Sequence, residues 1–160
     1  MDVKKKFRKA GVIGGGSWGT ALSKLLAEND IDVELWCYEP ELVSRINEEH
    51  ENPLFLPDIE LPDNFVLSVT PSHVVRDVWG EIADYFPVDT PIISATKGIV
   101  NETLMLISDI FEELLPGEVE LAYLSGPSFA KEVALRKPTG VTIASDNHEL
   151  AEAFQETFSN

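Results

Sequence analysis

The sequence predicts an α/β fold with a doubly wound, mainly parallel sheet and helices on both faces. Three observations predict it: strand-like and helix-like segments alternate along the chain, the first strand ends in a glycine-rich turn that opens a helix, and no internal repeat interrupts the alternation. A chain of 160 residues with 44% hydrophobic residues and a mean hydropathy of -0.03 has the composition of one globular domain, not of a disordered or collagen-like chain.

The N-terminal part reads as two strand–helix pairs. Residues 10–14 form a short apolar strand that ends in glycine, and residues 20–29 place leucines at helical spacing. Residues 33–37 read as a second strand and residues 39–49 as a helix, with Pro40 tolerated in its first turn. This βαβα order is the start of a parallel sheet, with a right-handed crossover.

The remaining chain continues the alternation after an irregular connector, residues 52–64, that carries three prolines. Further strands are predicted at 65–69, 91–95, 118–125 and 140–144, and further helices at 72–86, 101–115, 128–135 and 148–158. Asn101 is the expected N-cap of its helix.

The charge of the chain is strongly negative, -16 with a sequence pI of about 4.4. Residues 10–160 hold 7 basic and 27 acidic side chains, so binding to nucleic acid or to an anionic membrane surface is not expected. The basic residues 4–9 read as a solvated terminus, with a nucleic-acid arm as the alternative. No apolar run suits a signal peptide or a membrane span, and the single cysteine, Cys37, agrees with a cytoplasmic location.

The first turn carries the motif G-x-G-x-x-G, formed by Gly14, Gly16 and Gly19. Gly14 would permit the tight turn, Gly16 would let the backbone approach a pyrophosphate, and Gly19 would let the helix pack on the strand. The free N–H groups of the helix would hold the anion without a basic patch. This predicts a Rossmann-like dinucleotide site; a glycine-rich turn that binds nothing is the alternative.

Glu39 lies 20 residues after Gly19, where the residue that selects the cofactor is expected. Its carboxylate could accept hydrogen bonds from the ribose of NAD and would repel the 2′-phosphate of NADP, or it could merely open the next helix. Tyr38 could cover an adenine face or pack on the sheet edge. Cys37 is interpreted as an inert strand residue.

Two further corners lie at the carboxyl edge of the predicted sheet. Lys97 follows the fourth strand and could meet a phosphate or polarise a carbonyl, or it could be a solvated loop lysine. Gly126-Pro127 follows the fifth strand, and Ser128 is expected to begin a helix that offers a hydroxyl and free N–H groups to an anion, or else a plain capped turn.

Other chemistries have little support in the sequence. His50, His73 and His148 are scattered and have no metal-ligand spacing with one cysteine, so no metal site is expected. Neither a nucleophile elbow nor a P-loop motif is present. Trp18, inside the glycine turn, is expected to line the cofactor corner.

Five segments together resemble the NAD(P)-dependent glycerol-3-phosphate dehydrogenases of bacterial type. They occur in the family's order across residues 11 to about 144: GGGSWGTAL at 14–22, NPLFLP at 52–57 with Leu61-Pro62, PSH at 71–73, SATKGI at 94–99 and LSGPSFAKEV at 124–133. The glycine motif alone is shared with other dehydrogenases, and the later segments are specific.

The resemblance implies roles for particular residues. The cofactor is expected to be NAD, with NADP as the alternative, and Lys97 is expected to lie near both ligands as the catalytic residue. The implied contacts are Ser17, Trp18, Tyr38, Lys97 and Ala130 for the dinucleotide, and Lys97, Gly126 and Ser128 for glycerol 3-phosphate.

The implied reaction is reversible hydride transfer between the nicotinamide and C2 of glycerol 3-phosphate, interconverting it with dihydroxyacetone phosphate for phospholipid synthesis. The resemblance also implies a homodimer of the full-length enzyme. The family's general acid/base lysine and its helical substrate domain lie beyond residue 160. Residues 1–160 are therefore expected to be a truncated N-terminal dinucleotide-binding domain with little turnover.

Two features depart from the family pattern. A strand and a helix that relatives usually carry are missing at the junction between Asn64 and Val66, and Glu39 stands where bacterial relatives often have a basic residue, which favours NAD. Two other functions stay open: a non-catalytic NAD(H)-sensing Rossmann regulatory module, and a dehydrogenase of related architecture acting on a hydroxy acid. The segment at 94–98 disfavours the second, and a sensor needs neither Lys97 nor the corner at 125–128.

Overall fold

Parallel strands form the centre of the protein, seen in a computed structural model that describes residues 7–49, 51–52, 56–60, 69–85, 88, 90–101 and 103–159. One pair consists of β1 (Lys9–Ile13) and β2 (Asp32–Trp36), which run parallel. A second group consists of β5 (Ile92–Ser94), β6 (Leu121–Ser125) and β7 (Thr142–Ser145). β5 and β6 are parallel, so the predicted mainly parallel sheet is confirmed.

The last strand runs in the opposite direction to the one expected from regular strand–helix alternation. β7 pairs antiparallel with β6, with Ala122 opposite Ser145 and Ser125 opposite Thr142. The connecting helix α5 (Ala130–Ala134) has five residues and rises only about 7.5 Å. β7 begins where β6 ends, since Thr142 lies opposite Ser125, so the connection stays at that end of β6.

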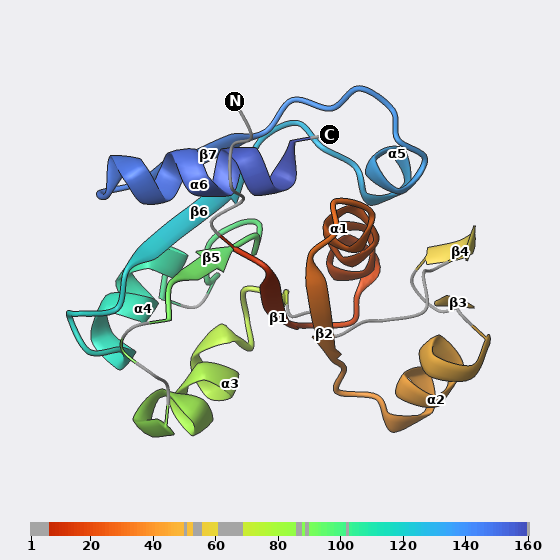
Figure 1. Ribbon diagram of the computed structural model, residues 1–160. Coiled ribbons are helices and arrows are strands. Elements are labelled where there is room, and N and C mark those ends of the chain that lie inside the picture. Colours follow the sequence, from red (N-terminus) through yellow and green to blue (C-terminus); the bar gives the residue numbers. More distant parts are fainter. Residues whose placement is uncertain are drawn as a thin grey trace.

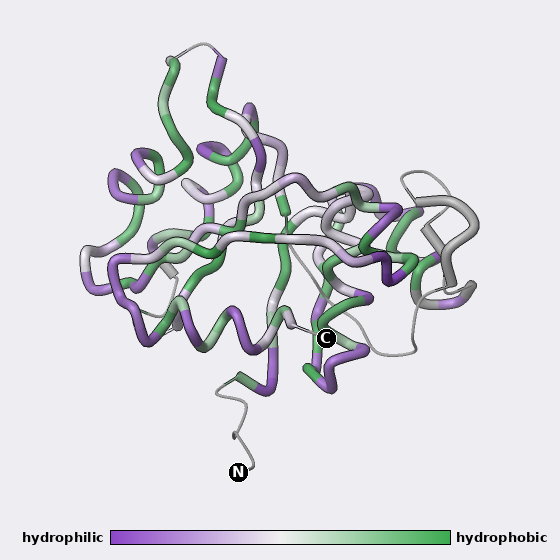
Figure 2. Tube along the Cα trace, turned by 90° about the horizontal axis from the view of Figure 1, so that it is seen from above, coloured by the Kyte–Doolittle hydropathy of each residue, from purple (hydrophilic) through white to green (hydrophobic). Residues whose placement is uncertain are grey.

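Helices cover both faces of these strands (Figure 1). The first face is covered by α1 (Ser17–Glu28), α5 and α6 (His148–Phe158), and the second by α3 (Val75–Ile82) and α4 (Ile107–Leu114). Hydrophobic and hydrophilic residues alternate along the helices, as Figure 2 shows, so each helix buries one side. This arrangement confirms the Rossmann-like α/β class that the sequence predicts.

The first core cluster joins the beginning and the end of the chain. Leu22 and Leu26 of α1 pack in one cluster with Leu150 and Phe154 of α6, all less than 9% exposed. Phe7 stacks on Phe154 with a centroid separation of 4.7 Å. Burial of four such side chains stabilises the fold by several kcal/mol, at roughly 2 kcal/mol each.

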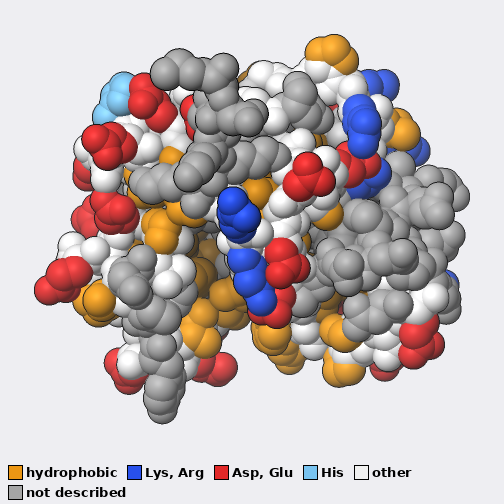
Figure 3. Space-filling model, in the orientation of Figure 1, with side chains coloured by type: hydrophobic (Ala, Val, Ile, Leu, Met, Phe, Trp, Pro, Cys, Tyr) orange, Lys and Arg blue, Asp and Glu red, His pale blue; other side chains and the backbone are white. Residues whose placement is uncertain are grey.

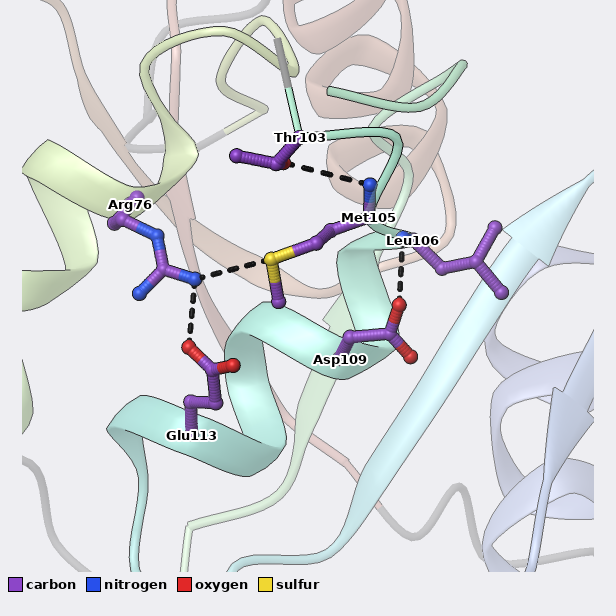
Figure 4. A network of polar contacts seen from close by, with 6 residues as sticks. All are labelled: Arg76, Thr103, Met105, Leu106, Asp109 and Glu113. Carbon is purple, nitrogen blue, oxygen red and sulfur yellow. Dashed lines mark hydrogen bonds and ion pairs between the residues drawn. The ribbon is translucent and has the colours of Figure 1, made fainter. Parts of the chain in front are cut away.

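The second core cluster lies between the sheet and the helices α3 and α4. Trp79 and Phe111 meet edge to face at 5.0 Å, and Val75 and Ile110 are almost fully buried beside them. Figure 4 shows the polar link between the same helices, in which the Arg76 guanidinium donates to the Glu113 carboxylate at 2.7 Å and to the Met105 sulfur at 3.4 Å.

The helix expected at residues 101–115 begins at Ile107 instead, and Asn101 does not cap it. Leu104 has a left-handed φ of 57°, and its N–H donates to the Val100 carbonyl at 2.7 Å, which closes a turn that a helix cannot continue. The Asp109 carboxylate accepts from the Leu106 N–H at 2.8 Å, so the cap comes from inside the helix (Figure 4).

Other boundaries shift or fall outside the described part. The helix α2 (Pro40–Glu49) follows the prediction closely, whereas the irregular connector contains two short antiparallel strands, β3 (Glu51–Asn52) and β4 (Leu56–Glu60). The predicted helix at 72–86 is α3 followed by a 3-10 turn at Ala83–Tyr85. The predicted strand at 65–69 lies outside the described residues except for Val69.

Candidate functional site

The glycine turn after β1 is shaped by two contacts that no side chain would fit. Gly14 has φ 125°, and a Cβ there would lie 1.8 Å from the Val69 carbonyl oxygen. A Cβ at Gly19 would lie 2.1 Å from the carbonyl oxygen of Gly14, so α1 packs directly on the turn. These are the tight turn and the close helix–strand approach that a dinucleotide fingerprint requires.

The start of α1 is open toward its surroundings. Gly16 occupies the N-cap, no side chain caps the helix, and a Cβ at Gly16 would have no neighbour within 4 Å. The first N–H groups of an α-helix have no partner within the helix, and its dipole favours an anion at that end. A phosphate group could therefore approach the backbone at Gly16 and Ser17.

Trp18 connects this turn with the end of β5. Its indole N–H donates to the Ala95 carbonyl at 3.0 Å, and the ring is partly buried against the first core cluster. The two residues are 77 positions apart in the sequence. The contact thus fixes the glycine turn against the segment that carries Lys97.

Lys97 extends from the end of β5 to the turn after β6. Its Nζ donates to the Ser128 carbonyl and to the Ser128 Oγ, both at 3.0 Å, and to the Gly126 carbonyl at 3.3 Å. The same Nζ lies 4.6 Å from the centroid of the Trp18 ring, within the range of a cation–π interaction. The structure therefore brings the turns after β1, β5 and β6 together around one ammonium group.

The turn after β6 differs from the prediction in where its helix starts. Helix α5 begins at Ala130, not at Ser128, and the Ser128 N–H donates to the Gly126 carbonyl at 2.9 Å. The helix start predicted at Ser128 is therefore wrong, because that N–H is already bonded within a Gly-Pro turn, whereas an anion site at this corner stays a prediction. The polar side-chain group in this turn is the buried Ser128 hydroxyl, which accepts a hydrogen bond from the Lys97 ammonium.

The end of β2 forms a separate part of the site. Tyr38 is 81% exposed, and Glu39 is partly buried just before α2. The Gly14 N–H donates to the Trp36 carbonyl at 3.0 Å, and a Cβ at Gly15 would lie 2.3 Å from the Cys37 Sγ, so the end of β2 lies beside the glycine turn. Burial, with a smaller effect of the Glu39 charge, raises the pKa of Cys37 to about 11, which fits an unreactive thiol.

Two threonines at the same edge were not singled out from the sequence. The Thr96 hydroxyl donates to the Thr70 carbonyl at 2.9 Å, and Thr70 is only 6% exposed. This bond holds the segment beside Gly14 to the segment that carries Lys97. The sequence feature that could have pointed to Thr70 is the polar stretch Thr-Pro-Ser at 70–72. It directly follows an apolar run, as the glycine turn and the Lys97 segment also do.

On the face shown in Figure 3, acidic side chains gather mainly at the left, and basic side chains lie at the centre and at the upper right. Within the described ranges no group of three His, Cys, Asp or Glu side chains could hold a metal ion. The described helices include none that is long and apolar enough to cross a membrane.

The fold and the glycine turn define the class of the protein: it is an α/β dinucleotide-binding domain of Rossmann type. The profile of the family described as NAD-dependent glycerol-3-phosphate dehydrogenase N-terminus matches residues 9–68 and 63–151. The chain belongs to this family, and NAD is its cofactor class.

Individual relatives agree with this assignment. The chain is 46% identical to a glycerol-3-phosphate dehydrogenase [NAD(P)+] of Leptospira biflexa, over 94% of this chain and 50% of that protein, and 45% identical to one of Citrifermentans bemidjiense over the same shares. The crystal structure of glycerol-3-phosphate dehydrogenase from Coxiella burnetii superposes with a TM-score of 0.85 at 30% identity, covering 96% of this chain and 51% of that one.

Two features of these matches concern the extent of the chain. It spans about half the length of the curated relatives it matches. The alignment with the Leptospira protein runs over 168 residues, more than the 160 of this chain, and the family match breaks into two segments that overlap at 63–68. Relatives therefore carry residues that this chain lacks, and the break falls at the short junction near Asn64.

Proposed function

We propose that this chain binds NAD(H) at the glycine turn, as the cofactor-binding part of a glycerol-3-phosphate dehydrogenase. The observation that carries the proposal is the uncapped start of α1 at Gly16, next to Trp18 and Lys97. The pyrophosphate would bind at the N–H groups that follow Gly16, with Gly14 and Gly19 shaping the turn. Ser17, Trp18 and Ala130 would contact the dinucleotide, and Tyr38 and Glu39 would lie at its adenosine end.

Lys97, Gly126 and Ser128 would hold the anionic substrate. An ammonium group has three donors, and all three are engaged, by the Ser128 carbonyl, the Ser128 hydroxyl and the Gly126 carbonyl. The bond to Gly126 is the longest, at 3.3 Å, and is the one that a substrate oxygen would most easily replace. Lys97 would then act as a catalytic residue that binds and polarises the substrate next to the cofactor.

The reaction supported by family membership is the transfer of a hydride from C2 of glycerol 3-phosphate to the nicotinamide of NAD⁺. The C2 hydroxyl loses its proton, and dihydroxyacetone phosphate and NADH form; the reverse reaction supplies glycerol 3-phosphate for phospholipid synthesis. The single, buried Cys37 supports a reducing cytoplasm as its location. The homodimer of the full-length enzyme stays a prediction from the resemblance.

Residues 1–160 would be the N-terminal domain of this enzyme, and a helical substrate domain with the general acid/base lysine would follow. The half-length coverage of the relatives supports this division. The 160-residue chain is therefore expected to bind a dinucleotide with little or no reduction of dihydroxyacetone phosphate. Turnover comparable to that of the full-length relatives would contradict this division.

The decisive experiment compares two glycine variants. Gly16→Ala places a methyl group in the open space where a pyrophosphate would approach, yet it meets no protein atom, and the Gly16 φ of -67° suits alanine. We expect a stability loss of about 1 kcal/mol at most, and a loss of NADH binding of at least tenfold in a tryptophan fluorescence titration.

Gly11→Ala is the matched control, because a Cβ at Gly11 also has no neighbour within 4 Å but lies inside β1, away from the turn. It should bind NADH as the unmodified chain does. Equal NADH affinity of the two variants would contradict a cofactor site at Gly16.

A further inference from the structure

The Lys97 ammonium is held by uncharged groups. Three of them are oxygen atoms of the turn after β6, namely the Gly126 carbonyl and the carbonyl and hydroxyl of Ser128. The fourth is the ring of Trp18, whose centroid lies 4.6 Å from Nζ. Among the residues that the structure describes, no carboxylate forms an ion pair with Lys97, although the chain holds 28 acidic residues. The charge of this ammonium is therefore not neutralised, and an anionic ligand can use it in full.

The ring and the oxygen atoms that hold Lys97 come from different parts of the chain. Trp18 is the second residue of α1 and belongs to the glycine turn, whereas Gly126 and Ser128 follow β6. An ammonium group has three N–H donors, and the oxygen atoms take all three. The face of an aromatic ring attracts a cation without using a donor. Trp18 therefore adds a contact from the glycine turn that does not compete with the oxygen atoms.

The orientation of the Trp18 ring is fixed by the segment that carries Lys97. Its Nε1–H donates to the carbonyl of Ala95, which lies two residues before Lys97 and is only 6% exposed. The ring also packs against the first core cluster. Because the indole N–H lies at the edge of the ring, this bond leaves the ring face free for the ammonium. A phenylalanine ring would offer a similar face without the bond that orients it.

The contact with the ring is most important when a ligand binds. A substrate oxygen would replace the longest bond of Lys97, the one to the Gly126 carbonyl at 3.3 Å. The four-carbon stem of a lysine is flexible, so an ammonium that loses a bond can turn away from its site. The attraction to a ring face does not require a particular N–H direction. It therefore keeps Nζ between the two turns while one hydrogen bond is exchanged for another.

We propose that Trp18 is a positioning residue, which holds the Lys97 ammonium between the glycine turn and the turn after β6 so that its charge meets the anionic substrate. This role is separate from a contact of Trp18 with the dinucleotide. It rests on the proposed function, in which Lys97 binds glycerol 3-phosphate. Loss of a cation–π contact of this kind weakens an affinity by roughly three- to tenfold.

The test compares Trp18→Phe with Trp18→Leu, because both lose the indole N–H and only Trp18→Phe keeps an aromatic face. In calorimetric titrations at saturating NADH, we expect Trp18→Leu to bind glycerol 3-phosphate roughly three- to tenfold more weakly than Trp18→Phe. In the Lys97→Met background the two should bind it equally, since no ammonium is left for the ring to hold. Trp36→Phe and Trp36→Leu, at a tryptophan that is 44% exposed, are the matched controls and should also bind it equally.

Urea unfolding without ligands measures the same contact independently. Replacing Trp18→Phe by Trp18→Leu should raise the unfolding equilibrium constant by a factor that is roughly two- to fivefold larger when Lys97 is present than in the Lys97→Met background. Equal factors in the two backgrounds, or equal glycerol 3-phosphate affinities of Trp18→Phe and Trp18→Leu, overturn the positioning role while the cofactor and substrate sites stand.

The unmodified chain separates this outcome from a failure of the proposed function. If it binds NADH but no glycerol 3-phosphate, the substrate role proposed for Lys97 is wrong, and the positioning role is wrong with it. If it binds neither ligand while its circular dichroism shows it folded, the cofactor site is overturned as well.

Discussion

The glycine turn after β1 and the lysine corner around Lys97 lie at the same edge of the sheet but are built in opposite ways. At the turn, the important property is the absence of side-chain atoms: a Cβ at Gly14 or Gly19 would lie about 2 Å from a carbonyl oxygen. At the corner, side-chain atoms make the contacts, and Lys97 alone forms three hydrogen bonds to the β6 turn. Trp18 is in contact with both regions.

This difference separates stability from binding. Substitutions at Gly14 or Gly19 press atoms into a packed backbone, so they act on folding first, unlike a substitution at the open Gly16. Substitutions at Lys97 remove an exposed ammonium group, so they weaken ligand binding before they change the stability of the fold. The four predictions below test whether the two regions behave in this way, beginning with the largest effect.

The largest expected effect is that of Gly14→Ala. The added Cβ would lie 1.8 Å from the Val69 carbonyl oxygen, and the φ of 125° strains any L-residue with a side chain. Overpacking and strain together should destabilise the chain by about 3 kcal/mol or more, measured by urea unfolding. Gly11→Ala is the control and should change stability by less than about 1 kcal/mol. Equal unfolding midpoints of the two variants would show that the turn is not tightly packed.

The second effect is expected at the corner and concerns binding. Lys97→Met removes an ammonium group that contacts both the Ser128 hydroxyl and the Gly126 carbonyl. Because a hydrogen bond to a charged group contributes about 1.5–3 kcal/mol, glycerol 3-phosphate binding in the presence of NADH should weaken by roughly 10- to 100-fold. Lys131→Met removes an exposed lysine of α5 and should leave this affinity unchanged. A larger effect of Lys131→Met would place the substrate elsewhere.

The third effect concerns the residue that joins the two regions. Trp18→Phe keeps an aromatic ring but removes the donor to the Ala95 carbonyl, which costs about 1 kcal/mol of stability. Trp36→Phe, at a tryptophan that is 44% exposed, is the control and should cost less. If both variants unfold at the same urea concentration, the indole bond contributes nothing to the junction.

The smallest effect is a dependence of stability on pH through Glu28. Burial raises the pKa of this carboxyl, but hydrogen bonds from Arg136 and Lys24 outweigh it and hold the pKa below its usual value. A depressed pKa means that the stabilisation is present at neutral pH and is lost as the pH falls through the folded-state value. Glu28→Gln should therefore be less stable than the unmodified chain at pH 7, and the gap should close below about pH 4. If the difference in stability between the two chains stays constant at acid pH, the ion pairs of Glu28 are not its source.

Elements with a local signal could be predicted from the sequence. Helix α6 begins and ends at the predicted residues, because Asn147 caps it: its side-chain oxygen accepts from the N–H groups of Glu149 and Leu150. Helix α4 could not be placed, since its start depends on the left-handed Leu104 and on a cap supplied by Asp109. The direction of β7 could not be predicted either, because side chains alternate between the two faces of a strand in parallel and in antiparallel pairs alike.

The site follows the same division. The meeting of Trp18, Lys97 and Ser128 could be expected, because strands that run parallel end at one edge of a sheet. Which groups bond there could not: Ser128 uses its N–H within its own turn, and Thr70 and Thr96 pair across 26 residues. Such contacts depend on the distances between turns, which a linear pattern does not contain.

The amide of Asn29 has a consequence for the order of events during synthesis. It ends α1 and donates to the carbonyls of Thr157 and Ser159, which are 128 and 130 residues later. A ribosome that extends the chain by about 5–20 residues per second needs roughly 6 to 26 seconds to reach those partners. During that interval β1 and α1 lack the contact with α6, the helix that packs against α1 in the complete chain. Nascent chains halted before residue 148 should therefore be more sensitive to protease at α1 than chains that carry α6.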